Sequence, residues 1–484
     1  MQVVEEQEDK YEVDADWALP PLADLVPDGG RLDQDVRRLE NTYFDTAGAG
    51  LRLFGVTLRR RVGGSETGWQ LKVPNGTART ELQSGSRAKR LPAPLADGVS
   101  GLRAGERLDQ VATMVTTRTA YRVLDAANEL VLEIADDQVE SGLPDGESML
   151  HSWREVEVEL GPAGKQEDLK RARKLLIAAG ATPSTIRTKL DRALGPISPD
   201  DEGSVVQQGK TTSNTVGDLV TAYLAAQCDV LASNDVGLRT GAPVVHKTRV
   251  AARRLRSTLR VFGDVFGEQP AQELNNEVAW YADLLGEVRD REVLNARLTQ
   301  QIADLPPERV RGPVEAEVTK TLAAERDDAI QRLSRGMRSR RYQHLLKLLR
   351  GWKSAPPLTN AADETDTTAA AYVKKAKQKA NKRLRSADGD IERLHRARKA
   401  TKRLRYAAEL VEPVDGNMKR VAKKAENLQT LLGEHQDAVV SAKFLANLSS
   451  SRNGESGDGG FTYGILMADE LHRAAAIRQS LKKK

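Results

Sequence analysis

The sequence predicts an α+β protein of more than one domain: an N-terminal antiparallel β tunnel or barrel, followed by an all-α region of two helical bundles. Three observations carry this prediction. Extended segments with alternating charged residues fill residues 1–195, a cationic helical segment occurs twice, and polar stretches bearing Pro and Gly separate the parts. The 484 residues are enough for two or three separate cores.

Successive side chains of a β-strand point to opposite faces, so residues two apart share a face. Glu6, Glu8 and Lys10 therefore lie on one face of the first extended segment. Residues 155–160 alternate Glu with Val or Leu in the same way. If the apolar faces pack outward, the charges line the interior of a polar tunnel. The alternative is that each strand exposes its polar face to solvent.

Several further strands repeat this alternation of charged and apolar positions. The residues that share a face are Arg59 with Arg61, Gln70 with Lys72, Arg79 with Glu81, and Glu133 with Asp137. Rows of carboxylates supply oxygen ligands for Mg²⁺ or Mn²⁺, and rows of Lys and Arg neutralise phosphate oxygens. The pattern therefore predicts a tunnel that holds a metal-bound oligophosphate in line for attack by water.

The chain divides at changes in composition. Residues 1–195 form the strand-rich domain, with one helix at about residues 167–179, and the polar residues 196–212 form a linker. The helical domain covers residues 213–484. Its repeats span about 213–352 and 368–484, and each is long enough for a bundle of about four helices. A loop is expected at residues 449–460, before the last helix.

The duplicated segment begins at His246 and again, 149 positions later, at His395. At 3.6 residues per turn, five polar residues that begin with His246 fall within an arc of roughly 80° on one helix face, opposite an apolar side. That stripe is His246, Arg249, Arg253, Arg256 and Arg260, and its copy is His395, Arg398, Lys402 and Arg405. One such stripe is typical of a solvated face. Its duplication favours a binding surface for an anion.

A second duplicated motif, Leu-Leu-Gly-Glu-x-x-Asp, ends at Asp290 and at Asp437. We expect these aspartates to orient nearby arginines rather than to catalyse a reaction.

Charge and cysteine content narrow the function. Residues 1–200 contain 26 Lys and Arg against 33 Asp and Glu, whereas the remaining residues contain 48 against 36, so the second half attracts polyanions. The single cysteine excludes an intramolecular disulfide. No stretch approaches the ~20 apolar residues that span a bilayer, and no signal peptide is evident. We expect a cytoplasmic protein.

The N-terminal motifs resemble the CYTH family of triphosphate tunnel enzymes over about residues 1–195. The family signature Glu-x-Glu-x-Lys matches residues 6–10, and the other matches are at residues 43–46, 58–61, 71–72, 79–81, 155–159 and 188–190. By this resemblance, the catalytic residues are Glu6, Glu8 and Lys10. The Mg²⁺ or Mn²⁺ ligands are Glu6, Glu8, Asp137, Glu157 and Glu159. Phosphate is bound by Lys10, Arg59, Arg61, Lys72, Arg118 and Lys189. Gln70 and Thr188 depart from the family's usual residues.

The duplicated half resembles a CHAD domain over about residues 213–484, because both repeats carry His-x-x-Arg-x-x-x-(Arg/Lys)-Arg-Leu-Arg and Leu-Gly-x-x-x-Asp. The resemblance implies two four-helix bundles related by a pseudo-twofold axis, with a basic groove that binds inorganic polyphosphate. The groove residues are those of the two stripes named above. Cations surround both histidines, which argues against metal chelation by them.

The leading hypothesis is a protein that binds inorganic polyphosphate and hydrolyses a triphosphate with a divalent metal, with association with polyphosphate granules left open. Two alternatives remain: a binding or granule-targeting protein without catalysis, and an activity like that of adenylate cyclase. A nucleic-acid partner is disfavoured, because an aromatic content of 4% leaves few stacking platforms. No membrane partner is expected.

Overall fold

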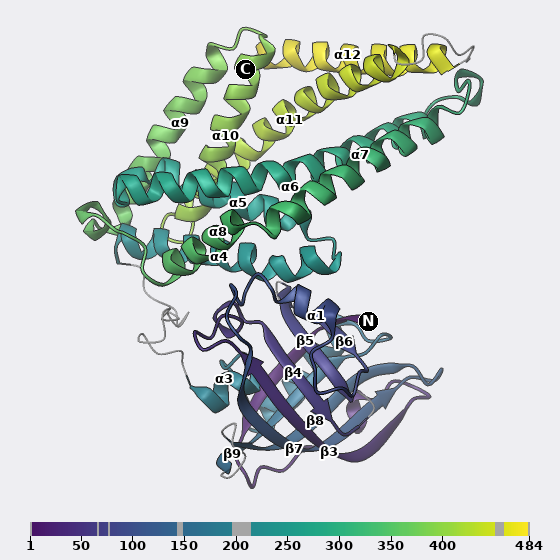
Figure 1. Ribbon diagram of the computed structural model, residues 1–484, viewed down its shortest axis with the longest axis vertical. Coiled ribbons are helices and arrows are strands. Elements are labelled where there is room, and N and C mark those ends of the chain that lie inside the picture. Colours follow the sequence, from purple (N-terminus) through teal and green to yellow (C-terminus); the bar gives the residue numbers. More distant parts are fainter. Residues whose placement is uncertain are drawn as a thin grey trace. The chain divides into compact units, whose positions relative to one another are not determined.

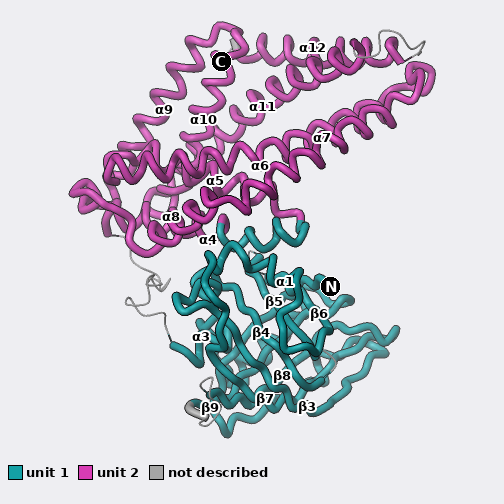
Figure 2. The backbone as a smooth tube through the Cα atoms, viewed as in Figure 1, with its two compact units in different colours: residues 1–206, 232–242 teal, residues 207–231, 243–484 magenta. Residues whose placement is uncertain are grey.

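The computed structural model describes residues 2–64, 67–75, 78–142, 149–195, 214–450 and 459–482. The chain divides into two compact units (Figure 2). Unit 1 comprises residues 1–206 and 232–242, and unit 2 comprises residues 207–231 and 243–484. The predicted linker 196–212 and most of the predicted loop 449–460 lie outside the described residues.

Unit 1 contains a ten-stranded antiparallel sheet within the described residues, with the order β1-β6-β5-β4-β3-β7-β8-β9-β2-β10 (Figure 1). The strands are β1 Gln2–Glu6, β2 Glu8–Val13, β3 Arg31–Asp45, β4 Thr57–Val62, β5 Gly68–Asn75, β6 Ala78–Ser84, β7 Asp109–Leu124, β8 Leu130–Gly142, β9 Met149–Leu160 and β10 Thr182–Pro183.

The sheet closes on itself at Gln7. β1 pairs with β6 at one end of the strand order, whereas β2 pairs with β9 near the other end. Gln7 joins β1 directly to β2, and its carbonyl accepts a hydrogen bond from the backbone N–H of Leu160 at 3.0 Å. The two ends of the sheet must therefore meet, which forms the barrel seen in Figure 1.

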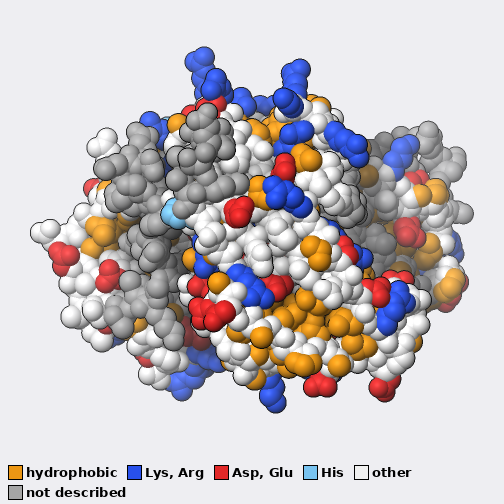
Figure 3. Space-filling view, turned by 90° about the horizontal axis from the view of Figure 1, so that it is seen from below, with side chains coloured by type: hydrophobic (Ala, Val, Ile, Leu, Met, Phe, Trp, Pro, Cys, Tyr) orange, Lys and Arg blue, Asp and Glu red, His pale blue; other side chains and the backbone are white. Residues whose placement is uncertain are grey.

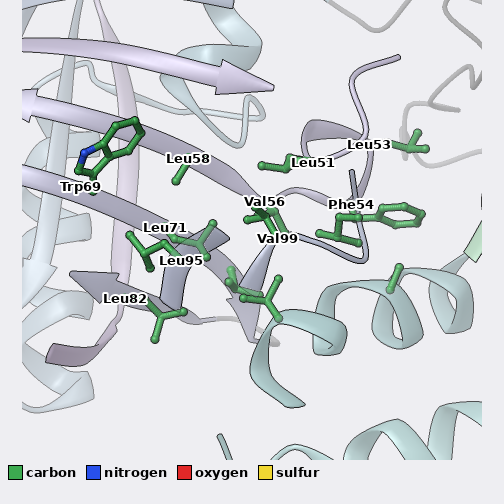
Figure 4. Packing of buried hydrophobic residues seen from close by; sticks show 14 residues of the cluster. Leu51, Leu53, Phe54, Val56, Leu58, Trp69, Leu71, Leu82, Leu95 and Val99 are labelled. Carbon is green, nitrogen blue, oxygen red and sulfur yellow. The ribbon is translucent and has the colours of Figure 1, made fainter. Parts of the chain in front are cut away.

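The apolar faces of the strands pack outward, as the tunnel prediction requires. Leu58, Leu71 and Leu82 of β4, β5 and β6 belong to one hydrophobic cluster with Phe54 and with Leu95 of helix α1 (Ala93–Gly98), shown in Figure 4. A second cluster joins β2, β8 and β9 to helix α2 (Gln166–Ala178), close to the predicted helix. Charged side chains between these apolar positions are thereby left to face the interior.

The surface seen in Figure 3, which views the molecule of Figure 1 from below, carries Lys and Arg side chains interspersed with Asp, Glu and apolar side chains. Neither sign of charge dominates that face.

Unit 2 is helical. Its helices, the first of which continues into unit 1, are α4 Val216–Thr240, α5 Val245–Val261, α6 Glu268–Ala303, α7 Val314–Met337, α8 Arg340–Ser354, α9 Ala369–Arg385, α10 Ile391–Val411, α11 Asn417–Ser450 and α12 Gly459–Lys482. Short α3 (Lys189–Leu194) belongs to unit 1. The 3-10 turns are 23–25, 52–54, 263–265, 307–309, 360–363 and 366–368.

The helices follow the sequence repeat. α6 and α11 begin 149 residues apart, at Glu268 and Asn417, so α4–α7 correspond to α9–α12 and α8 is additional. The predicted apolar sides of α5 and α10 are buried, including Leu255, Leu259 and Val411. This confirms a duplicated helical region.

The last turns of α4 belong with unit 1, where Ala232 and Val236 join the cluster around Leu71. Helices α6, α7, α11 and α12 share another core, which contains Leu298, Val318 and Leu445. No helix among the described residues is long and apolar enough to cross a membrane.

Candidate functional site

The register of the barrel brings charges of opposite sign face to face across neighbouring strands, an arrangement that stabilises a sheet. Directly opposed pairs of this kind include Glu6–Arg79, Lys10–Glu157, Lys72–Glu81, Arg118–Asp137 and Arg122–Glu133.

These strands enclose a cavity of about 950 Å³. Among the described residues its wall carries nine Lys and Arg and eight Asp and Glu. The wall includes every metal-binding and phosphate-binding residue of the tunnel that the resemblance implies: Glu6, Glu8, Lys10, Arg59, Arg61, Lys72, Arg118, Asp137, Glu157, Glu159 and Lys189. Since the two signs nearly balance, an oligophosphate that entered alone would meet almost as many carboxylates as cations.

Lys189 and Arg118 bind the same two carboxylates. Lys189 Nζ lies 3.0 Å from Asp137 and 2.7 Å from Glu157, and Arg118 donates to these groups at 2.7 Å and 2.8 Å. Lys10 also contacts Glu157. Burial alone would raise the pKa of both carboxyl groups, but the cations hold each pKa below its usual range. Asp137 and Glu157 are therefore ionised and already paired.

Thr188 explains how Lys189 is positioned. The Thr188 side chain accepts a hydrogen bond from the backbone N–H of Asp191 at 2.9 Å, which caps helix α3. Lys189 is thereby fixed in the first turn of α3, with its ammonium group on the cavity wall. A threonine performs this capping role in place of the serine that is common in the family.

Glu6 and Glu81 form a close acidic pair around Lys72, whose Nζ lies 2.6 Å and 2.9 Å from them. Burial raises the pKa of Glu6 to about 8 against the opposing charge of Lys72. Burial would raise the pKa of Glu81, but Lys72, a hydrogen bond with Glu6 and the charge of Arg59 together lower it. The acidic pair therefore retains one proton at neutral pH.

Arg59 and Arg61 are buried and bonded to neutral groups. Arg59 donates to Gln70 at 2.6 Å and to the Tyr43 hydroxyl at 3.3 Å, and Arg61 donates to Asn41 at 3.0 Å. Sequence reasoning identified the arginines but not Asn41 and Tyr43 as their partners. The signal was present, because those two residues share one face of β3.

Glu6, Glu8 and Glu159 are the carboxylates that best fit a divalent cation. Glu8 and Glu159 are directly opposed across β2 and β9, an arrangement of like charges that is destabilising alone. Burial, with repulsion from Glu8, raises the pKa of Glu159 to about 7 despite Lys72. A hard cation with a preference for oxygen would relieve this repulsion. In the described part of the chain, no three acidic, His or Cys side chains are gathered closely enough to hold an ion as they stand.

Helices α5 and α10 pack against each other in unit 2 and bring cations of both repeats together. We call Arg249, Arg253, Arg398 and Lys402 the central cluster. Burial and the three arginines lower the pKa of Lys402 to about 6. Among the described residues, the buried Nε atoms of Arg253 and Arg398 have no hydrogen-bond acceptor. A bound anion would supply the missing acceptors and offset the repulsion among these cations.

The rest of the predicted stripe divides into two. Arg256 and Arg260 continue along α5 and lie within electrostatic range of Arg403 of α10. Arg405 is instead ion-paired with Glu409 at 2.7 Å and Glu426 at 3.0 Å. The structure thus joins most of the two stripes but places Arg405 among carboxylates.

Residues of the second duplicated motif contact the cations of the first. Arg249 donates to Asp290 at 2.8 Å, as predicted, and Gly286 leaves room for the same guanidinium group. Burial and neighbouring cations lower the pKa of His246 and His395 below the usual value, so both imidazoles are neutral at neutral pH. The two histidines therefore offer hydrogen bonds rather than charge.

Comparison with known proteins agrees with this architecture. A family model of the CYTH domain matches residues 24–187, and a model of the CHAD domain matches residues 222–446. The uncharacterized protein Rv2226 of Mycobacterium tuberculosis is 33% identical over 476 residues, which cover 93% of this chain and 90% of the relative. The chain therefore belongs to the family of proteins that join a CYTH domain to a CHAD domain.

Two solved structures are also similar. PptA from Streptomyces chartreusis is 22% identical, with a TM-score of 0.47, and the match covers 56% of this chain and all of that one. The CHAD domain from the plant Ricinus communis is 26% identical, with a TM-score of 0.42, and the match covers 56% of this chain and 93% of that one. CYTH domains include triphosphatases and cyclases and are generally metal-dependent, and CHAD domains are linked to polyphosphate. The function of this chain is thus related to triphosphate or polyphosphate.

Proposed function

We propose that this protein binds inorganic polyphosphate through its helical domain and hydrolyses inorganic triphosphate in its tunnel with a divalent metal. The observation that carries the proposal is the tunnel wall, where Glu6, Glu8 and Glu159 adjoin rows of lysine and arginine. Phosphoryl transfer depends mainly on positioning and on neutralisation of charge, and such a wall supplies both.

In this proposal Glu6, Glu8 and Glu159 hold the metal, Mg²⁺ or Mn²⁺. The ion, when bound, would neutralise phosphate charge and lower the pKa of water. Arg59, Arg61, Lys72, Arg118 and Lys189 bind phosphate oxygens. In the hydrolysis, a water oxygen bonds to the terminal phosphorus and the bridging P–O bond breaks, which yields phosphate and pyrophosphate.

The central cluster supports the second half of the proposal. Two repeats supply like charges to one place, and burial makes their mutual repulsion costly. A linear polyanion that contacts both α5 and α10 relieves the repulsion in both helices, and each contact strengthens the other.

The test measures phosphate release from tripolyphosphate, ATP and long-chain polyphosphate, each with and without Mg²⁺ or Mn²⁺. The proposal predicts metal-dependent release from tripolyphosphate. If no substrate released phosphate while polyphosphate still bound, the protein would be a binding protein without catalytic activity. Formation of cyclic AMP from ATP, without release from tripolyphosphate, would replace the triphosphatase with a cyclase.

A further inference from the structure

The two ends of the α5–α10 contact differ in charge although the helices are copies. We call Arg256, Arg260, Arg383 and Arg403 the bare flank. The paired flank comprises Arg254, Arg405, Glu409 and Glu426. Arg254 and Arg403 occupy equivalent positions 149 residues apart, as do Arg256 and Arg405, so the flanks can be compared position by position.

The sequence difference that separates the flanks is small. At the 149-residue offset, Arg260 of α5 stands where α10 has Glu409. At the 147-residue offset of the second motif, Ala279 of α6 stands where α11 has Glu426. The first repeat therefore lacks both carboxylates that the second repeat places beside its arginines.

On the paired flank the carboxylates neutralise the arginines. Glu409 accepts hydrogen bonds from Arg254 at 2.9 Å and from Arg405 at 2.7 Å. Glu426 lies 3.0 Å from Arg405 and 2.8 Å from Lys423. Little positive charge is left there to attract a polyanion.

On the bare flank the arginines face one another. In the described part of the chain, none of the four guanidinium groups has a carboxylate within 4.0 Å. Arg260 donates to the neutral Asn275 at 3.2 Å, and the buried Nε of Arg256 has no acceptor among the described residues. Asp283 attracts Arg256 only at longer range. Burial and the other three arginines lower the pKa of Arg403 to about 10.

We infer that a polyphosphate chain leaves the central cluster over the bare flank and not over the paired flank, so that a duplicated scaffold carries a one-sided binding site. The inference rests on the proposed binding of polyphosphate. Helix α5 provides the path, because Arg249, Arg253, Arg256 and Arg260 follow one face over roughly 16 Å of helix axis. A long chain spans both the central cluster and the bare flank, and its affinity combines the two.

The test compares long-chain polyphosphate affinities of full-length variants in EDTA, which removes any contribution of metal in the tunnel. One variant combines Arg260→Glu with Arg403→Glu. Its matched control combines Lys419→Glu with Arg420→Glu, the same change of charge on exposed residues beside the paired flank. Arg253→Glu with Arg398→Glu serves as the reference for the central cluster.

We expect the bare-flank variant to lose about tenfold in affinity and the control less than about twofold. Equal losses in these two variants, with a large loss in the reference, would overturn the inference and leave the proposed function standing. Full affinity in the reference variant would overturn both.

A variant of the paired flank tests the same inference through a gain of polyphosphate affinity instead of a loss. Glu426→Ala installs the residue of the first repeat and releases Arg405 on the paired flank, with Glu409 still in place. The inference predicts a gain of about twofold in affinity, and Glu409→Arg should increase it further. Circular dichroism of each variant shows whether the helices are intact. A folded Glu409→Arg variant without any gain would contradict the inference.

Discussion

The tunnel and the central cluster both contain many cations, but carboxylates neutralise the cations of the tunnel and few carboxylates neutralise those of the central cluster. In the tunnel, Lys72 and Lys189 each contact two or more carboxylates, and these raise the pKa of both lysines above the usual value against the effect of burial. In the central cluster, Lys402 is surrounded mainly by arginines, and its pKa falls to about 6. Lysines thus remain charged in one region and lose their charge in the other.

This difference separates two ways to recognise phosphate. In the tunnel, positive and negative side chains nearly balance and the cations are preorganised. A triphosphate is repelled by the carboxylates, so its binding requires a metal ion that neutralises them. A cluster of unbalanced cations needs no metal, because the polyanion itself supplies the missing negative charge.

The largest effect is expected from Glu6→Gln and Glu8→Gln, which remove carboxylates from the tunnel. Metal-dependent turnover of tripolyphosphate should fall by about a hundredfold or more, because an amide is a weaker ligand for a hard cation. Affinity for long-chain polyphosphate should not change. Asp9→Asn is the control, since Asp9 follows Glu8 on β2 but pairs with Arg173 at 2.7 Å. Wild-type turnover in both glutamine variants would refute their assignment as ligands.

The pH dependence of polyphosphate binding tests the central cluster. Lys402 is neutral above pH 6 when free, and bound phosphate should raise its pKa, so binding takes up a proton. Between pH 7 and 8 the affinity should fall by up to about tenfold per unit as the pH rises.

Lys402→Arg checks the origin of this pH effect. Arginine stays charged, and Arg253 already occupies the equivalent position of the first repeat. The variant should bind polyphosphate with little dependence on pH in the same range. A slope equal to that of the wild type would assign the proton to another group.

Lys72→Ala should weaken triphosphate binding about tenfold, seen as a higher KM, because a positioned ammonium group neutralises substrate and transition state alike. The same substitution at the exposed Lys89 provides the control. A lower kcat at unchanged KM would instead assign Lys72 to the transition state alone.

The smallest effect concerns stability. Since the pKa is about 8 for Glu6 and about 7 for Glu159, protons compete with metal at acidic pH. Mg²⁺ should therefore raise the melting temperature of the protein by a few degrees more at pH 8 than at pH 6. A Mg²⁺ effect that is larger at pH 6 would contradict the proposed ligands.

Local periodicity in the sequence predicts much of this structure. Alternation in the strands identified many of the charged residues that line the tunnel, and the repeat identified the cationic faces of α5 and α10. Both patterns follow directly from backbone geometry. Arg118 and Lys189 came from the family resemblance, and the lining residues Asp35, Arg37 and Arg122 were missed.

The sequence also showed the motif at residues 43–46, but it did not show what structural role the motif has. The Asp45 carboxylate accepts backbone N–H groups of Thr46, Leu51 and Arg52 at 2.7–3.0 Å, so Asp45 shapes a turn.

Contacts between elements that are distant in the chain could not be predicted from the sequence. The proton retained by Glu6 and Glu81 depends on β1 lying beside β6, and the neutralised state of Arg405 depends on a carboxylate from α11. Helical spacing placed Arg256 and Arg405 in equivalent positions. Their surroundings differ because Glu409 lies four residues further along α10 and because α11 brings Glu426 beside Arg405. The contribution of Ala232 and Val236 to the core of unit 1 was hidden for the same reason.

The most direct test of the account is removal of metal from a single preparation of the full-length protein. Tripolyphosphate turnover and long-chain polyphosphate affinity would be measured with Mg²⁺ and then with EDTA. We expect EDTA to abolish turnover while the affinity for polyphosphate stays within about twofold. Loss of both in EDTA, or turnover that persists without metal, would contradict the distinction between a metal-dependent tunnel and a metal-independent central cluster.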